Sequence, residues 1–249
     1  MNARAKDARH WCGPAGVPSY GEYLQRDSVG APEVLRDETW EPLGTDPLRA
    51  DRYTSREFFE LEAARMWTRV WQMACREEDI PEVGDATVYE IVGKSFVVVR
   101  TAPDRIRAFY NSCLHRGRKL LLGPAHVENL RCPFHGFTWN LDGSPKSVPC
   151  RWDFPQLSDE DLKLPEARVE TWGGFVFLNM DSAAPPLADY LGVLPQHFAR
   201  WQPEQRWKAA HVGKVIPCNW KVAQEAFMES YHVIATHPQI LEFCADANA

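Results

Sequence analysis

Two short segments share one pattern: Cys113-Leu114-His115-Arg116-Gly117 and Cys132-Pro133-Phe134-His135-Gly136. Each segment offers one cysteine and one histidine, and 16 residues, Arg116 to Arg131, separate the two pairs. A glycine closes each segment, and glycine adopts backbone conformations that other residues avoid. The pattern predicts two tight loops, each of which presents a thiol and an imidazole.

Two thiolates and two imidazoles are the ligands of one kind of [2Fe–2S] cluster, in which cysteines hold one iron and histidines hold the other. Neutral histidines in place of thiolates remove negative charge and raise the reduction potential. Zinc is the competing metal, but its Cys₂His₂ sites usually pair cysteine with cysteine and histidine with histidine. The mixed pairs favour an iron–sulfur cluster over a zinc site or a chance grouping.

The residues around the two loops have the alternating pattern of strands. A tight hairpin is predicted at Gly93-Lys94, between strands at 86–92 and 95–101. Further strands are expected at 106–110, 138–141 and 174–180. Residues 83–181 are therefore predicted to form a small antiparallel β domain.

Helices are predicted on both sides of this domain. Thr54 and Glu57 have the spacing of a capping box, which indicates a helix from 54 to 71. Asn219 is a suitable N-cap for a second helix, from 219 to 235. Two smaller elements are expected before the second helix: a short helix at 187–194 and a strand at 211–216.

The composition is that of an ordinary globular protein, with 45% apolar and 25% charged residues among 249. The net charge of −6 comes from both signs and gives no indication of nucleic-acid binding. No apolar run reaches the roughly 18 residues of a membrane span, and the start of the sequence lacks the apolar core of a signal peptide, so a cytoplasmic location is expected. Small buried side chains without a metal role are the expectation for the cysteines outside the loops: Cys12, Cys75, Cys150, Cys218 and Cys244.

A second group of metal-binding residue types lies further along the sequence: Glu229, His232 and His237. On a helix Glu229 and His232 are about 60° apart and share a face, whereas His232 and His237 are about 140° apart. Pro238 offers a solution, because the residue before a proline is driven out of the helical conformation. His237 can then turn back toward His232. Two histidines and one carboxylate are the ligand set of non-haem Fe(II) oxygenases, and two unrelated histidines near a helix end are the alternative.

Both groups of residues resemble those of one family. The two Cys/His loops are similar to the Rieske domain in the α subunit of Rieske non-haem iron ring-hydroxylating oxygenases, and the stretch from Asn219 to His237 is similar to the mononuclear-iron motif of the same subunit. The resemblance covers about residues 40–249. It implies an α+β fold, in which an antiparallel β Rieske iron–sulfur domain precedes the beginning of a helix-grip (Bet v1-like) catalytic domain.

The predicted organisation has four parts: an N-terminal arm at 1–52, a helical lead-in at 53–82 that belongs to the catalytic part, the Rieske [2Fe–2S] domain at 83–181, and the start of the catalytic domain at 182–249. The resemblance assigns the cofactors as follows: a [2Fe–2S] cluster on Cys113, His115, Cys132 and His135, and a mononuclear Fe(II) on His232 and His237.

The resemblance also implies a dioxygenase or monooxygenase activity and its partners. Electrons would come from NAD(P)H through a ferredoxin or a flavin reductase, and would pass by way of His135 and the catalytic residue Glu229 to the iron of a neighbouring subunit. The Fe(II) would then activate O₂ to hydroxylate a small substrate, with aromatic dihydroxylation in hydrocarbon catabolism as the first expectation. The family further implies a homotrimer, with or without a small β subunit, and neither a membrane nor a nucleic acid as partner.

The sequence departs from the family pattern in two places. The third iron ligand is a carboxylate far downstream of the second histidine, and Glu242 and Asp246 do not match its position. We therefore expect that the sequence is the N-terminal part of a longer subunit, truncated before this ligand, and that this part loads the cluster without hydroxylating a substrate. Ala226 stands where the family often has Asn, and Glu225 is expected to be a solvated helix charge.

Three alternatives accompany this hypothesis. A stand-alone Rieske electron-transfer protein would explain the loops but needs no second iron. A second alternative is a Rieske monooxygenase or demethylase that acts on quaternary amines. The sequence Phe-Met-Glu-Ser-Tyr-His at residues 227–232 resembles that of such enzymes. A zinc-stabilised interaction module would show no visible absorbance.

Overall fold

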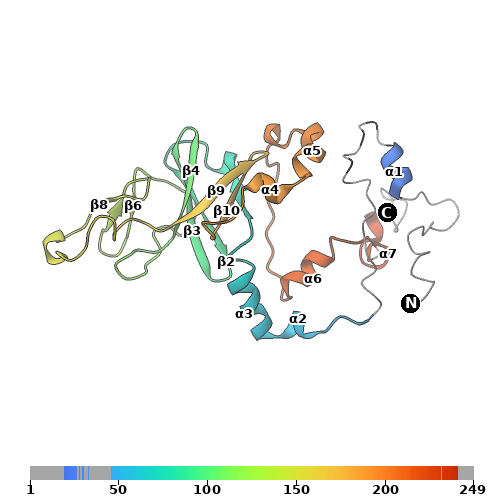
Figure 1. The fold of residues 1–249 in the computed structure, drawn as a ribbon, viewed down its shortest axis with the longest axis horizontal. Helices are drawn as coiled ribbons and strands as arrows, with labels where there is room; N and C mark the ends of the chain where they lie inside the picture. Colours follow the sequence, from blue (N-terminus) through green and yellow to red (C-terminus); the bar gives the residue numbers. More distant parts are fainter. Residues whose placement is uncertain are drawn as a thin grey trace. The chain divides into compact units, whose positions relative to one another are not determined.

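Seven strands form the main sheet of the computed structural model, in the order β1-β10-β9-β4-β3-β2-β5. All of its neighbouring strands pair antiparallel. A second sheet has the order β6-β7-β8 and is also antiparallel. The antiparallel β domain predicted from the sequence is thereby confirmed, and Figure 1 shows β6 and β8 at one end of it and α4 and α5 at the other.

The structure describes residues 20–26, 28, 30, 33, 46–230 and 232–240. The strands are β1 Gln72–Arg76, β2 Asp85–Ile91, β3 Lys94–Ala102, β4 Arg105–Tyr110, β5 Ala125–His126, β6 Leu130–Arg131, β7 Thr138–Trp139, β8 Pro145–Ser147, β9 Glu166–Trp172 and β10 Phe175–Asn179. The α-helices are α1 Tyr20–Arg26, α2 Asp51–Thr54, α3 Arg56–Arg65, α4 Leu187–Leu191, α5 Leu194–Phe198, α6 Trp220–Glu225 and α7 Val233–Thr236. Short 3₁₀ helices are η4 Glu77–Asp79, η5 Arg151–Asp153, η6 Ala199–Trp201, η7 Pro203–Gln205 and η8 Pro238–Ile240.

The chain divides into two compact units. The first holds both sheets and runs from Trp67 to Trp207, together with Met1–Thr45. The second consists of Asp46–Met66 and Lys208–Ala249. The predicted arm over residues 1–52 lies largely outside the described residues. In the described part of the chain, no helix is both long and apolar enough to cross a membrane.

The predicted hairpin is present between β2 and β3, but its two turn residues are Val92 and Gly93 rather than Gly93 and Lys94, because Lys94 already pairs with Ile91. Both turn residues have positive φ angles, 43° and 77°, which is the geometry of a type I′ turn and matches the twist of the flanking strands. The register pairs Ile91 with Lys94 and Glu90 with Ser95.

Alternate residues of β3 enter two different cores, because successive side chains of a strand point to opposite faces of the sheet. Phe96 and Val98 pack with Ala108 on one face. Val97 and Val99 pack on the other face, in a cluster that also contains the two loop cysteines. The cluster loops are therefore anchored in the hydrophobic core of the β unit.

In the second unit, helices α3 and α6 are joined by a mostly buried ion pair. The Lys221 ammonium lies 2.7 Å from a Glu62 carboxylate oxygen, and the two side chains are 16% and 10% exposed. The Trp220 indole N–H donates to the other Glu62 oxygen at 3.2 Å. The same ammonium lies 5.0–5.7 Å from the ring centres of Tyr53, Phe58 and Trp220, within the range of cation–π attraction.

Several element predictions were wrong in detail. The helix predicted at 54–71 is capped by Ser55 rather than Thr54, because the Ser55 hydroxyl accepts from the Phe58 N–H at 3.2 Å, and it ends at Arg65. Residues 211–216 form no strand. Strands β1 and β9 were not predicted, and β1 lies inside the predicted helical lead-in although it pairs with β10.

The predicted single helix at 219–235 is divided into α6 and α7. Asn219 caps α6 as predicted, accepting from the Lys221 N–H at 3.0 Å. Between the helices, Phe227 and Met228 are 92% and 74% exposed. Most helical stability in proteins comes from packing an apolar face, and these largely exposed side chains provide little of it.

Candidate metal centres

The two Cys/His loops have the same backbone hydrogen bonds. In the first loop the Cys113 N–H donates to the Arg118 carbonyl and the Gly117 N–H donates to the Cys113 carbonyl, both at 2.8 Å. The second loop repeats these bonds from Cys132 and Gly136, at 2.8 and 3.0 Å. Both glycines have left-handed backbones, with φ of 74° and 77°. The predicted pair of tight loops is therefore present, and the loops are equivalent in backbone geometry.

The two thiols point inward. Cys113 is 3% exposed and Cys132 is 2% exposed, and both belong to the core cluster of the β unit. Burial raises the pKa of the Cys113 thiol, and the neighbouring Cys132 thiol raises it further. Iron binds the thiolate, so loading this site releases protons. In an apolar core the resulting charge is stabilised by the metal itself.

The two imidazoles meet at the tips of the loops. The Nδ1 atoms of His115 and His135 lie 3.1 Å apart, and the ring centres are 4.7 Å apart. The His115 ring stacks on Phe137, with centroids 5.0 Å apart and planes 10° apart, and meets Phe154 edge-on. The Phe134 ring contacts His135. No sequence pattern predicts these aromatic contacts, although Phe134 and Phe137 flank the His135-Gly136 pair.

This donor set fits a [2Fe–2S] cluster with two thiolate and two imidazole ligands. Two buried sulfurs lie in the core, and two nitrogens converge nearer the surface. If both Nδ1 atoms bind iron, the proton of each neutral imidazole is on Nε2. Among the described residues, no group of three or more His, Cys, Asp or Glu side chains could hold a single metal ion. A [2Fe–2S] cluster does not need three protein side chains around a single ion, since each of its irons takes two protein ligands.

Glu229, His232 and His237 are brought together at the start and end of α7. One Glu229 oxygen lies 2.6 Å from His232 Nδ1, and the other accepts from the His232 N–H at 3.1 Å. The His232 and His237 rings lie 5.4 Å apart, centre to centre. His237 ends α7 with a non-helical backbone, as the following Pro238 predicts. The carboxylate occupies Nδ1 of His232, which leaves Nε2 for a metal.

Among the described residues, His232 and His237 are the two candidate histidine ligands of a facial triad, which needs a carboxylate as its third ligand. Glu242 and Asp246 lie outside the described part of the chain, so the structure does not describe their placement. Glu225 is exposed as predicted, but it is not only solvated, because it accepts a hydrogen bond from the Tyr53 hydroxyl at 2.8 Å. That contact raises the pKa of Tyr53. The carboxylate of Glu225 thus serves to join α2 to α6.

Two family descriptions match the chain. The Rieske [2Fe–2S] domain matches residues 70–158, which contain both Cys/His loops. The catalytic domain of ring hydroxylating alpha subunits matches residues 198–248, which contain Glu229, His232 and His237.

The relatives include both a monooxygenase subunit and a dioxygenase subunit. The chain is 32% identical over 189 residues to the carnitine monooxygenase oxygenase subunit of Escherichia coli (strain K12), a match that covers 75% of this chain and 50% of that protein. It is 33% identical over 196 residues to the biphenyl 2,3-dioxygenase subunit alpha of Rhodococcus jostii (strain RHA1), over 74% of this chain and 42% of that protein. The crystal structure of a quaternary ammonium Rieske monooxygenase with L-carnitine superposes with a TM-score of 0.73 at 28% identity, over 78% of this chain and 55% of the other.

The chain therefore belongs to the α subunits of the Rieske non-haem iron oxygenases. The two matching domains imply a Rieske [2Fe–2S] cluster and a mononuclear iron as cofactors, as the sequence predicted. The chain spans about half the length of the curated relatives it matches. The roles of the individual site residues stay predictions, and the geometry of the two groups supports them.

Proposed function

We propose that the protein is the oxygenase subunit of a Rieske-type system that hydroxylates a small organic substrate with O₂. The observation that carries this proposal is the joint presence of the His115–His135 pair over two buried cysteines and the Glu229–His232–His237 group. An electron carrier needs the first group alone. When bound, the cluster supplies one-electron transfer and the mononuclear iron supplies activation of O₂.

The chain's own residues have distinct tasks in this proposal. The thiols hold the buried side of the cluster, where the core excludes water. His115 and His135 hold the side nearer the surface, where electrons enter and leave. Glu229 fixes the orientation of His232, because one carboxylate binds both the backbone N–H and Nδ1 of that residue. As in the sequence hypothesis, Glu229 is also proposed to contact His135 of a neighbouring subunit.

Two substrate classes are candidates. Quaternary ammonium compounds are supported by the carnitine monooxygenase subunit and by the structure solved with L-carnitine. Aromatic hydrocarbons, the first expectation from the sequence, are supported by the biphenyl dioxygenase subunit. For partners, we infer a reductase or ferredoxin that delivers electrons from NAD(P)H, and a homotrimer in the cytoplasm. The relatives' names, "oxygenase subunit" and "subunit alpha", support an assembly of several subunits.

The test uses the protein expressed from its native gene, loaded with iron and supplied with a reductase, NADH and ¹⁸O₂. L-carnitine, glycine betaine and biphenyl are offered in turn, and the products are analysed by mass spectrometry. Substrate-dependent incorporation of ¹⁸O is the expected result, and the Cys132→Ser protein should lose it. If NADH is oxidised but ¹⁸O is incorporated into none of the three substrates, the result would favour the electron carrier.

A further inference from the structure

The two cluster loops are supported differently by the sheets. The second loop joins β6 to β7, which pair with each other on either side of it. The first loop follows β4, and residues 118–121 beyond it lie in no helix or strand. Buried backbone N–H and C=O groups still need hydrogen-bond partners. Something other than a neighbouring strand must hold this side of the first loop.

The side chain of Asn111 takes the place of that strand. Its Oδ1 accepts from the N–H groups of Leu120 and Leu121, at 2.8 and 3.1 Å. Its Nδ2 donates to the Leu121 carbonyl at 2.8 Å and to the Ser95 hydroxyl at 3.1 Å. Asn111 is 3% exposed, and these four bonds use both lone pairs and both hydrogens of the amide.

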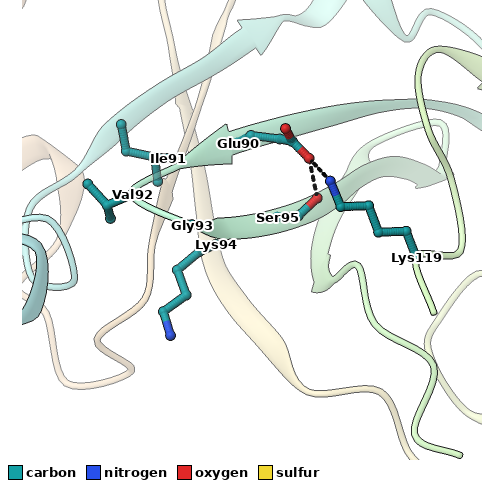
Figure 2. Close-up of a pocket in the computed structure, with 7 residues that line it drawn as sticks. All are labelled: Glu90, Ile91, Val92, Gly93, Lys94, Ser95 and Lys119. Atoms are coloured by element: carbon teal, nitrogen blue, oxygen red, sulfur yellow. Dashed lines mark hydrogen bonds and ion pairs between the residues drawn. The ribbon is translucent and has the colours of Figure 1, made fainter. Parts of the chain in front are cut away.

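Asn111 is in turn braced by the main sheet. Its backbone N–H donates to the Ser95 carbonyl at 2.9 Å. The Ser95 hydroxyl donates to Glu90 Oε1 at 3.0 Å, and the Lys119 ammonium bonds the same oxygen, as Figure 2 shows. Glu90 and Ser95 are opposite each other in the β2–β3 pair. Three consecutive loop residues, 119–121, are thus held by Glu90 of β2 and by Asn111, which directly follows β4.

We propose that Asn111, braced by Ser95 and Glu90, is a positioning residue that sets the orientation of His115 and, through it, the redox properties of the cluster. The connection is short, because the Cys113 N–H bonds the carbonyl of Arg118, one residue before Lys119. A shift of residues 119–121 therefore reaches the loop that carries both ligands. Groups that orient metal ligands tune the affinity and the potential of a site. This inference rests on the proposed function for the presence of the cluster.

The experiment compares four variants of the 249-residue chain. Asn111→Ala removes all four side-chain bonds. Asn111→Asp keeps the acceptors for the two backbone N–H groups. Ser95→Ala removes the brace alone. Asn140→Ala is the matched control, since the Asn140 amide also bonds a serine hydroxyl, that of Ser144 at 2.9 Å, but in the turn after β7.

Two kinds of measurement separate positioning from a merely structural role. In the metal-free chain, hydrogen exchange at Leu120 and Leu121 should accelerate in Asn111→Ala and stay slow in Asn111→Asp and in the control. In the loaded chain, Asn111→Ala should lose its cluster about tenfold faster, with a broadened EPR signal of the reduced cluster and a shifted midpoint potential. Asn111→Asp should recover cluster retention, and Ser95→Ala should show smaller changes of the same kind.

Faster exchange in Asn111→Ala with an unchanged EPR signal and potential would overturn the proposal, because Asn111 would then support the loop without influencing the cluster. If Asn111→Ala does not fold, Ser95→Ala decides: an unchanged EPR signal and an unchanged midpoint potential in that variant overturn the proposal. A parent chain that takes up no cluster contradicts the proposed function and ends the redox part of this inference. The exchange comparison would still show whether Asn111 holds the loop.

Discussion

The Nδ1 atom of His115 lies 3.1 Å from the Nδ1 atom of His135, although the two residues are 20 positions apart in the chain. One histidine stands on a loop after β4 of the main sheet, and the other on the loop between β6 and β7 of the small sheet. Their cysteine partners lie buried in the same core cluster. Each of the two sheets thus positions one thiol and one imidazole, and the two pairs of side chains meet at one place.

Replacing Cys132 should abolish the cluster, whereas replacing Cys150 should not. Cys132 is buried in the loop, and Cys150 is exposed, against the expectation that it is a buried side chain. After anaerobic loading with iron and sulfide, Cys132→Ser is expected to show no visible absorbance and Cys150→Ser the full absorbance of the parent. Equal absorbance in both variants would remove Cys132 from the ligand set.

Glu229→Ala should weaken iron binding at the two histidines by about tenfold, because the carboxylate that orients His232 is lost. The matched variant is Glu225→Ala, which removes a carboxylate from α6 that bonds Tyr53 and neither histidine. Calorimetric titration with Fe(II) under nitrogen measures both. The orienting role of Glu229 is contradicted by equal affinities of Glu229→Ala and the parent.

Two glycine variants separate backbone strain from steric overlap. Gly93 and Gly143 both have positive φ, 77° and 83°. A Cβ on Gly93 meets no atom within 4 Å, whereas one on Gly143 would lie 2.5 Å from the buried ring of Phe109. We expect the free energy of unfolding to fall by about 1 kcal/mol in Gly93→Ala and by about 3 kcal/mol in Gly143→Ala. Urea titration gives both values, and equal losses would mean that the Phe109 ring moves away freely.

Acid should destabilise the β unit partly through Asp85. The hydrogen bond with His126, at 2.8 Å, holds the pKa of Asp85 below its usual range, and the bond from the Glu82 N–H lowers it further. A depressed pKa stabilises the folded state above the unfolded value of about 3.9, and this contribution is lost as the pH falls through the folded pKa.

Asp85→Asn should therefore lower the melting temperature at pH 7 and flatten its decrease below about pH 4. Asp104→Asn, in the exposed turn after β3, is the control and should follow the parent curve. A melting profile of Asp85→Asn that runs parallel to that of the parent across the acid range would exclude a contribution from Asp85.

The sequence predicted the parts of the fold that local chemistry determines. The turn at Gly93, the cap at Asn219 and the two loops each depend on a few neighbouring residues with strong preferences. The convergence of His115 with His135, and of Cys113 with Cys132, could also be predicted, because cysteine and histidine pairs at this spacing are typical of one kind of cluster site. The departure of His237 from the helix followed from Pro238 alone.

The remaining elements depend on contacts that the sequence does not display. Strand β1 is short and directly follows the helical region, and its strand conformation comes from pairing with β10, about 100 residues away. The helix predicted at 219–235 is interrupted where Phe227 and Met228 are largely exposed, so the segment between α6 and α7 gains little stability from packing. No sequence pattern predicts the role of Asn111 either, because that role depends on its contacts with Ser95 and with the loop that it holds.

The reduction potential of the loaded 249-residue chain tests the central claim most directly. A cluster held by Cys113, His115, Cys132 and His135 should titrate at about −150 mV or above, because two neutral imidazoles replace two thiolates. Iron should be found in an amount equal to or above that of sulfide, because the His232–His237 site can bind a further iron, and zinc should be absent. A potential near −400 mV, typical of a cluster with four cysteine ligands, or a chain that binds zinc and no cluster, would contradict the assignment.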